Sequence, residues 1–233
     1  MTKQELFEQL KKRLINIDEH KLEQLYELMY STLETNKKFN LTAIKEEDAF
    51  VEKRLFDSAI ALQFLDINDK NVIDVGTGAG FPGMVLHILE PNAHITLMDS
   101  TAKKIKYLMG YCSEKGLTQN IDFIADRAES RVIRNEMDYA FARAVAPLNI
   151  LIELIVPMLK VGGVFVALKG SGYEQEILDA KTAMKRLGCR LQKVVEDNLP
   201  ESDELRVMIH IVKEKDTLPK YPREYSEIKK LPL

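Results

Sequence analysis

The chain has 233 residues, and its 33 lysines and arginines against 36 acidic residues give a formal net charge of −3. This length predicts one large α/β domain or a domain with a small appendage. The charge excludes a polycation, so any nucleic-acid binding must use a local basic patch.

The hydropathy, the start of the chain and the cysteines indicate a cytoplasmic protein. No apolar run approaches the roughly 20 residues of a membrane-spanning helix, so we expect no membrane partner. The segment Met1–Phe7 is polar with a helical pattern, unlike a signal peptide. Cys112 and Cys189 lack the spacing of a metal site and are too few for a disulfide framework. We therefore expect a reducing compartment and no metal.

Residues 1–66 are predicted to form a helical segment that packs on the core. Leucines recur with helical spacing between residues 3 and 36, and Asp18 is placed to cap the second helix. A third helix is expected over about 46–65, before a turn-rich stretch. No glycine precedes Gly76, which fits a helical segment.

Residues 67–233 are predicted to form the second part, in which short β-rich runs alternate with helical stretches. This alternation indicates βαβ units and a largely parallel sheet. The last two strands flank a link too short for a crossover helix, so they should pair antiparallel. The tail from Lys213 to Leu233 contains three prolines and is predicted to be an extended strap. The expected strands are 71–75, 94–99, 121–125, 138–143, 163–168, 190–196 and 206–212.

A glycine cluster, Gly76-x-Gly78-x-Gly80, follows the first predicted strand. A strand that turns sharply into a helix brings bare backbone close to a ligand, and glycine permits that approach. The third glycine comes one residue earlier than in the dinucleotide motif G-x-G-x-x-G, and Asp74 precedes the cluster. This form resembles the motif of S-adenosylmethionine (SAM)-dependent methyltransferases. Together with the strand pattern, it predicts their Rossmann-like class I fold: a seven-stranded, mostly parallel sheet with one antiparallel strand.

Ligands of open α/β sheets bind beyond the carboxyl ends of the strands. Asp99-Ser100 ends the second strand, and a carboxylate there can accept both hydrogen bonds from a ribose diol, or cap the next helix. After the third strand, Asp126 and Glu129 compete to accept from an adenine amine, and each is equally explained as a helix cap or a solvated acid. Phe81 either walls the cofactor pocket or packs in the core.

Two cations end the fourth and fifth strands. Arg143 closes an apolar strand, so it should meet a carboxylate, a cofactor carboxylate or a phosphate. The alternative is an ordinary salt bridge to Asp74 or Asp99. Lys169 is predicted at the rim of the pocket, where it either contacts nucleic-acid phosphate or is only a solvated charge.

Motifs that the chain lacks restrict the possible methyl acceptors. It has no (D/N/S)-P-P-(Y/F) loop after strand four, and neither cysteine is placed for attack on a pyrimidine. Ribose 2′-O methylation needs a base, and Lys169 keeps that option open. Guanine N7 needs no base, because its lone pair is free at neutral pH, so such an enzyme works by alignment and by excluding water. We therefore assign no certain catalytic residue and take Arg143 and Lys169 as positioning candidates.

The chain resembles the bacterial small-subunit ribosomal RNA guanine-N7 methyltransferases, also called glucose-inhibited division protein B. The resemblance implies SAM contacts at Gly76, Phe81, Ala128, Glu129 and Arg143. It also implies that the acceptor is one guanine in a loop of 16S rRNA in the small ribosomal subunit, and we expect a monomer. The matching residues include Asn36-Lys37, Asn40-Leu41-Thr42, Asp57-Ser58, Asp74–Gly83, Asp99-Ser100, Arg127-Ala-Glu129, Arg143–Leu148, Lys169-Gly170 and Tyr221-Pro-Arg223.

Departures from the family pattern concern the basic surface. The chain has Thr35 where the family commonly has Trp, and Lys53-Arg54 where it commonly has Arg-His. Positive charge survives, so an RNA-facing role stays open, while any histidine-specific function is in doubt. Sequence-specific RNA recognition prefers unpaired bases. The candidate RNA-binding residues are Lys37, Lys53, Arg54, Lys103, Lys104, Lys169 and Arg223.

Three other functions compete with guanine-N7 methylation. One is a SAM enzyme acting on a small molecule or on ribose 2′-O, and another is a dinucleotide-dependent oxidoreductase, whose glycine spacing this chain lacks. The last is a ribosome-assembly binder without catalysis, which the intact ligand positions disfavour.

Overall fold

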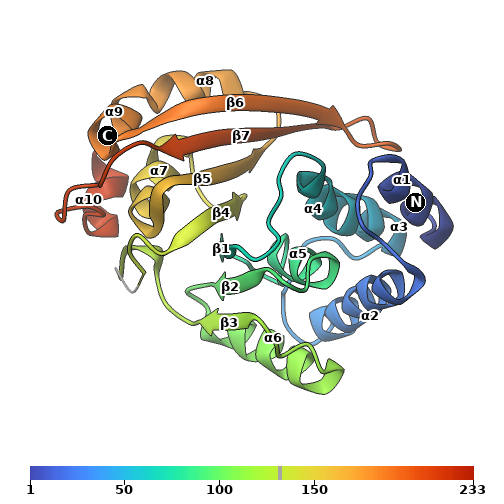
Figure 1. The fold of residues 1–233 in the computed structure, drawn as a ribbon. Helices are drawn as coiled ribbons and strands as arrows, with labels where there is room; N and C mark the ends of the chain where they lie inside the picture. The colour runs from blue at the N-terminus through green and yellow to red at the C-terminus, as the bar shows by residue number, and fades with distance from the viewer. Residues whose placement is uncertain (131–132) are drawn as a thin grey trace.

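The fold is built on one seven-stranded sheet. The computed structural model describes residues 1–130 and 133–233. The strand order is β3-β2-β1-β4-β5-β7-β6, and only β7 runs antiparallel, against both β5 and β6 (Figure 1). The predicted fold class is therefore confirmed. The strands are β1 (Asn71–Val75), β2 (His94–Met98), β3 (Ile121–Ile124), β4 (Met137–Arg143), β5 (Leu159–Lys169), β6 (Cys189–Asn198) and β7 (Leu205–Lys213).

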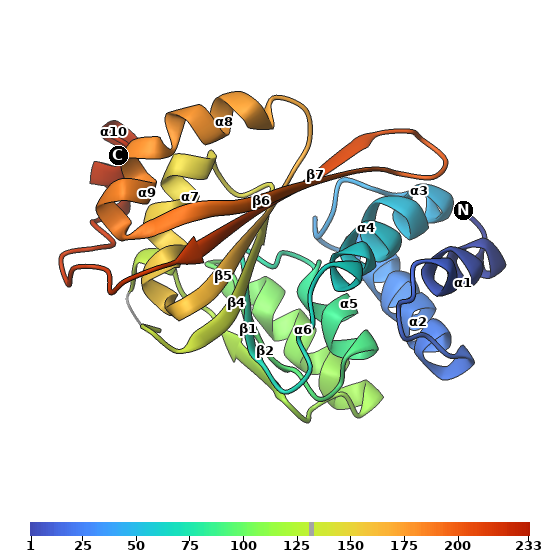
Figure 2. The same cartoon turned by 45° about the horizontal axis from the view of Figure 1, so that its top comes forward.

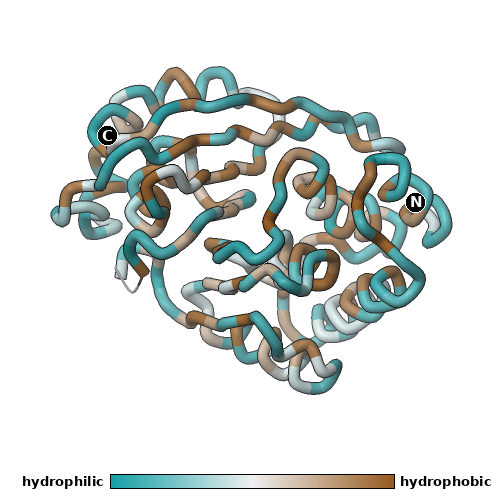
Figure 3. The backbone as a smooth tube through the Cα atoms, in the orientation of Figure 1, coloured by the Kyte–Doolittle hydropathy of each residue, from teal (hydrophilic) through white to brown (hydrophobic). Residues whose placement is uncertain are grey.

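Each face of the sheet carries its own hydrophobic core. Side chains of a strand alternate between faces, so Val72 packs with the α5 and α6 side, whereas Ile73 packs with α7 and α9. Figure 3 shows the hydrophobic segments in the central strands and hydrophilic ones in the outer loops. The helices concerned are α5 (Gly83–Leu89), α6 (Ala102–Lys115), α7 (Leu148–Ile155), α8 (Tyr173–Asp179) and α9 (Lys181–Leu187).

The N-terminal helices extend the first of these cores. Phe50 and Leu25 share a buried cluster with Phe81 of the glycine loop. The predicted cap is present, since Asp18 Oδ1 accepts from Lys21 N at 2.8 Å. The division of the chain at residue 66 stays a prediction. The elements are α1 (Lys3–Lys12), α2 (Glu19–Asn36), α3 (Glu47–Phe50), the π-helical turn η1 (Val51–Phe56), α4 (Asp57–Ala59) and the 3₁₀ turn η2 (Ile60–Gln63).

The stretch predicted as one helix over 46–65 is helical but not uniform. A π-helical turn at its centre inserts an extra residue per turn, and such turns are frequent at functional sites. The turn lets Glu52 point to one side, where Oε1 accepts from the backbone N–H groups of Glu201 and Ser202 at 2.7 and 2.9 Å. The β6–β7 hairpin thus reaches over the N-terminal helices, as Figure 2 shows.

The prediction of a wholly extended tail is wrong for one segment. Tyr225–Lys230 forms helix α10, and Ile228 is fully buried in the α7 side of the core. Pro219 and Pro222 precede this segment and Pro232 follows it, so no proline interrupts the helix. Burial of its single large aliphatic side chain supplies the driving force. None of the helices in the described ranges is long and apolar enough to span a bilayer.

Candidate active site

The glycine loop after β1 requires glycine for its backbone shape. Gly76, Gly78 and Gly80 have φ values of +75°, +61° and +96°, the left-handed region that side chains disfavour. A Cβ on Gly76 would also lie 2.5 Å from Val145 Cγ2. The loop is held against β2, because Gly76 N donates to Met98 O at 2.8 Å. The glycine pattern is therefore explained by a tight turn beside the loop after β4.

A cleft of about 180 Å³, the glycine-loop cleft, lies beyond the carboxyl ends of β1, β2 and β3. It unites five of the predicted cofactor residues, although they come from three separate loops. It also includes Val145, Leu154 and Tyr225, which the sequence did not single out. The predicted residues in its lining are Gly76, Asp99, Ser100, Ala128 and Glu129.

Asp99 is fixed by two backbone donors. Oδ2 accepts from Gly78 N at 3.0 Å and Oδ1 accepts from Thr101 N at 2.8 Å, just before α6. Lys104 Nζ lies 3.4 Å from Oδ2. The alternative that Asp99 caps the next helix is wrong, because the N-cap of α6 is Thr101 and has no side-chain cap bond. Asp99 instead holds the backbone just before α6, and its side chain borders the cleft. A carboxylate oxygen has two lone pairs, so Oδ1 can accept a further bond, whereas Oδ2 already accepts from Gly78 and Lys104.

Phe81 occupies the core rather than the cleft. Its ring packs edge-on against Phe50, with centroids 5.3 Å apart, and it is not among the residues that line the cleft. A Cβ on Gly80 would lie 2.6 Å from Met84 Cγ, so Gly80 also serves packing. Asp126 and Glu129, the two acids that compete for the adenine amine, both border the cleft. Glu129 Oε1 lies 3.5 Å from Arg127 Nη1.

Asp74 is a buried acid beneath the glycine loop. Its Oδ2 accepts from Thr77 Oγ1 at 2.7 Å and from Gly83 N at 2.8 Å. Burial raises the pKa of this carboxyl to about 6, although these hydrogen bonds and the charge of Arg143 lower it. Oδ1 has no partner within residues 1–130 and 133–233. The carboxyl group therefore keeps an unused acceptor, but it is buried beneath the loop and Asp74 is not among the residues that line the cleft.

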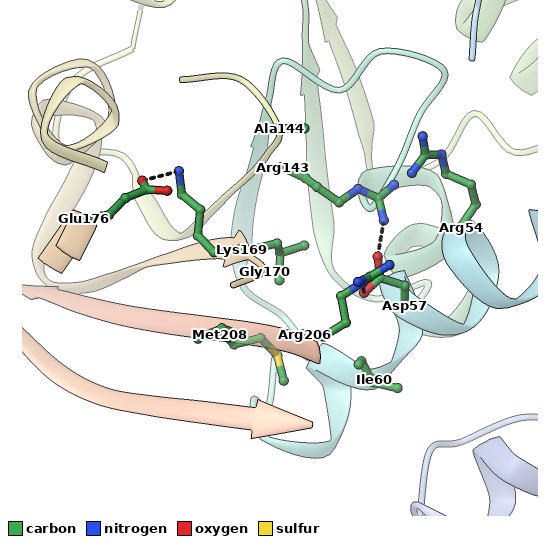
Figure 4. A pocket seen from close by; sticks show the side chains of 12 residues that line it. Arg54, Asp57, Ile60, Arg143, Ala144, Lys169, Gly170, Glu176, Arg206 and Met208 are labelled. Carbon is green, nitrogen blue, oxygen red and sulfur yellow. Dashed lines mark hydrogen bonds and ion pairs between the residues drawn. The ribbon is translucent and has the colours of Figure 1, made fainter. Parts of the chain in front are cut away.

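A second cavity, the arginine pocket, has a volume of about 380 Å³ and lies beside the ends of β4 and β5 (Figure 4). Arg143 Nη1 lies 3.0 Å from Asp57 Oδ2, and Arg206 Nε lies 3.2 Å from Asp57 Oδ1. The suggested salt-bridge partners of Arg143, Asp74 and Asp99, are therefore wrong. The pocket is lined by Arg54, Asp57, Ile60, Arg143, Ala144, Leu168, Lys169, Gly170, Glu176, Arg206, Val207 and Met208.

Lys169 is tied to the protein rather than free at the rim. Its Nζ lies 2.6 Å from Glu176 Oε2 and donates to Ala146 O at 2.9 Å. The arrangement suits positioning of the β4 loop and does not suit proton abstraction.

The other predicted RNA-binding cations are spread over the surface. Arg223 donates from Nε and Nη2 to the fully buried Glu153, at 2.7 and 2.6 Å, on the α7 side of the sheet, far from the N-terminal helices. Lys53 is paired with Glu204. The remaining cations are Lys37 beside Glu34, Lys103 over the Phe39 ring and Lys104 beside Asp99.

Two members of the arginine pocket escaped the reasoning from sequence. Asp57 stood in a stretch noted only as a family match, and Arg206 begins an edge-side strand with no recognisable motif around it. Their roles arise from a contact between segments about 150 residues apart in the chain. No group of three or more histidine, cysteine or acidic side chains suited to a metal occurs in the described residues.

Comparison with solved structures defines the class of fold. The chain is similar to a SAM-dependent methyltransferase from Aquifex aeolicus, with a TM-score of 0.55 and 16% identity over 77% of this chain and 98% of that one. It is also similar to TYW2 from M. jannaschii in complex with AdoMet, with a TM-score of 0.56 and 15% identity over 73% and 79%. The fold is that of the Rossmann-like SAM-dependent methyltransferases.

Sequence comparison identifies the family. Residues 18–204 match the model of the GidB family, described as rRNA small subunit methyltransferase G, and the chain belongs to that family. Ribosomal RNA small subunit methyltransferase G of Caldanaerobacter subterraneus is 43% identical over 89% of both chains. The protein of the same name from Staphylococcus aureus is 40% identical over 100% of this chain and 99% of that one. The resemblance noted from the motifs is confirmed.

Proposed function

We propose that this protein transfers a methyl group from S-adenosyl-L-methionine to N7 of a guanine in a loop of 16S rRNA. The observation that carries the proposal is the match to the GidB family, which spans the glycine loop, Asp99, Glu129 and Arg143. The substrate is the small-subunit rRNA named in the family description.

The glycine-loop cleft fits the cofactor. When bound, SAM supplies a methyl group on a positively charged sulfur. In our proposal Asp99 accepts from the ribose hydroxyls, and Ala128 and Glu129 border the adenine. Gly76 brings bare backbone to the cofactor, while Gly78, Gly80 and Ser100 shape the loops around it.

Phe81 and Arg143 take narrower roles in the proposal. Because the Phe81 ring is packed on Phe50, only its backbone is offered to the cofactor. Arg143 uses Nη1 on Asp57 and Ser58, and its other guanidinium nitrogens have no partner in the described part of the chain. They suit the carboxylate of the cofactor's methionine moiety.

The pairing of Lys169 favours guanine N7 over ribose 2′-O as acceptor. Ribose methylation would need a base at the pocket, and Lys169 donates to Glu176 and Ala146 instead. Guanine N7 attacks with its own lone pair, so the protein has only to align the base and exclude water. Lys169 and Arg143 are therefore positioning residues in this mechanism.

We further propose that the protein acts as a monomer in the cytoplasm. Residues 1–66 would form a helical segment that helps to grip RNA beside the methyltransferase part, residues 67–233. Sedimentation analysis tests the oligomeric state, and deletion of the N-terminal helices tests the grip. Full methylation by the shortened protein would exclude that role.

A transfer experiment tests the function. Protein is incubated with labelled SAM and with unmodified 16S rRNA, either free or in small subunits, and the methylated nucleotide is mapped. We expect label in N7-methylguanine at one position. Label in a 2′-O-methylribose would favour the alternative acceptor, and absence of label with both substrates would refute the proposal. SAM at a hundredfold excess over Kd should also stabilise the fold by about 2.7 kcal/mol, whereas NAD should not.

A further inference from the structure

We propose that the arginine pocket receives the target nucleotide, turned out of its RNA loop, and that Arg54 holds a phosphate adjoining that nucleotide. This inference rests on the function proposed above and adds a place and a specific contact for the acceptor. It assigns Arg54 to the RNA and leaves the glycine-loop cleft and Arg143 to the cofactor.

The two cavities meet at one peptide. Ala144 lines the arginine pocket and the next residue, Val145, lines the glycine-loop cleft. Ala144 has a φ of +55°, a left-handed conformation that a residue with a Cβ adopts at a cost. The loop thus separates the cavities by a single turn of backbone, so a donor in one and a base in the other can approach each other there.

The arginine pocket has the size and the charge for a nucleotide. Its volume of about 380 Å³ lies within the range of small-molecule sites. Four cations and two carboxylates line it, an excess of two positive charges on a protein whose net charge is −3. A local positive site on an acidic protein is expected where a polyanion must enter. An enzyme that acts on a base must also take it out of the stack, and an unpaired loop makes that step cheap.

Arg54 is the cation of the pocket whose charge is least compensated. Arg143 and Arg206 both pair with Asp57. Lys169 pairs with Glu176, which also accepts a hydrogen bond from Leu148 N. Within residues 1–130 and 133–233, Arg54 forms no ion pair, and its one hydrogen bond goes to Lys53 O at 3.3 Å. Figure 4 shows its guanidinium beside that of Arg143.

The surroundings of Arg54 favour the binding of an anion. Burial and the charges of Arg143 and Arg206 together lower the pKa of Arg54 to about 10, against an opposing effect of Asp57. The group is still charged at neutral pH, so the protein keeps a partly buried cation beside two others. A phosphate diester would relieve this repulsion and match the planar fork of donors.

The test compares Arg54→Met with Arg190→Met. Arg190 lies on β6 with an exposed side chain paired to Glu214, so the control removes the same charge from outside both cavities. Each variant is assayed for kcat and KM with 16S rRNA or small subunits over a range of salt concentrations. The Kd for SAM is measured by calorimetry, and folding is checked by thermal melting.

We expect Arg54→Met to raise the KM for RNA at least tenfold and leave the Kd for SAM within about twofold. The slope of log(kcat/KM) against log salt should fall by about one, as for a lost phosphate contact. Arg54→Lys should recover part of the affinity, and Arg190→Met should match wild type. Should Arg54→Met fail to fold, Arg54→Gln gives the same comparison.

Two results would overturn the inference. A Kd for SAM that rises in step with the KM for RNA would place Arg54 in the cofactor site. An unchanged KM and salt slope would leave Arg54 without a role in RNA binding. Failure of wild-type protein to methylate rRNA would instead refute the proposed function, so the two failures can be told apart.

Discussion

The glycine-loop cleft and the arginine pocket share the loop after β4 but are built differently. The cleft is made by short runs that directly follow β1, β2 and β3, and its key acid, Asp99, is held by local backbone N–H groups. The pocket is made by the η1 turn, two strand ends and β7, joined through Asp57 to arginines far away in the sequence. Local motifs thus form the proposed cofactor site, whereas long-range ion pairs form the proposed site of the target nucleotide.

The largest expected effect tests whether Arg223 supports the cleft or binds RNA. Arg223→Met would leave the fully buried carboxylate of Glu153 without its guanidinium partner. An uncompensated buried charge costs about 3–5 kcal/mol, which corresponds to roughly 10 °C in Tm for a chain of this size. Thermal and denaturant unfolding measure the loss, and Arg190→Met serves as the exposed control. An unchanged Tm with a raised KM for RNA would restore Arg223 as an RNA contact.

The second prediction concerns His210, which lies on β7 on the same face as Arg206 and Met208 of the arginine pocket. Burial lowers the pKa of His210 to about 4, with a smaller effect from Lys193, and neither ring nitrogen has a partner in the described residues. The folded state thus favours neutral histidine. Its stability is expected to fall as the pH drops from about 6.5 towards 4, by about 3 kcal/mol in total.

The substitution His210→Leu removes this acid sensitivity. Relative to wild type, the variant should gain about 3 kcal/mol of unfolding free energy between pH 7.5 and pH 4. Denaturant titrations at several pH values measure the difference in unfolding free energy. The contribution of Asp74 to the pH dependence cancels in this difference, because both proteins contain it. His20→Leu, at an exposed helix position, is the control. Parallel pH curves for wild type and His210→Leu would contradict the account.

The third prediction concerns the backbone of the cleft. Gly76→Ala introduces a Cβ at φ +75° and against Val145, so the loop must shift away from the cofactor. We expect SAM affinity to fall at least tenfold, or about 1.4 kcal/mol. Gly116→Ala is a matched control, because its φ is +71° and its Cβ would meet open space. Equal SAM affinity in the two variants would remove the glycine loop from the cofactor site.

The smallest effect sharpens the role of Asp99. Asp99→Asn keeps the shape of the side chain but removes the charge that would strengthen bonds from a ribose diol. We expect about fivefold weaker binding of SAM, roughly 1 kcal/mol, with the KM for RNA unchanged. Calorimetry with Asp122→Asn, an exposed acid on β3, provides the control. Unaltered affinity would limit Asp99 to organising the start of α6.

The fold was predictable because each of its signals is local. Alternating β-rich and helical runs identified every strand of the sheet, and the short link 197–203 correctly indicated the antiparallel pair. The tail helix α10 was missed because its stability comes from burying Ile228 against another part of the chain. The π-helical turn at Val51–Phe56 was also missed, since hydrophobic periodicity does not distinguish it from an α-helix.

The site was predictable to the same extent. The glycine-loop cleft brings together Gly76 and Asp99, which strand ends identified, and Glu129, which the family resemblance favoured over Asp126. The sequence left two possibilities for Phe81, and only packing on Phe50 decides where its ring lies. Nothing local in the sequence joins Asp57 to Arg206, so the arginine pocket emerges only from the folded chain.

The most direct test of the central claim is to map the methyl group transferred from labelled SAM to unmodified 16S rRNA. The account predicts about one labelled methyl per rRNA, on N7 of a single unpaired guanine, because the protein aligns a base that needs no deprotonation. Label on a ribose 2′-oxygen, or no transfer to rRNA or small subunits, would contradict it.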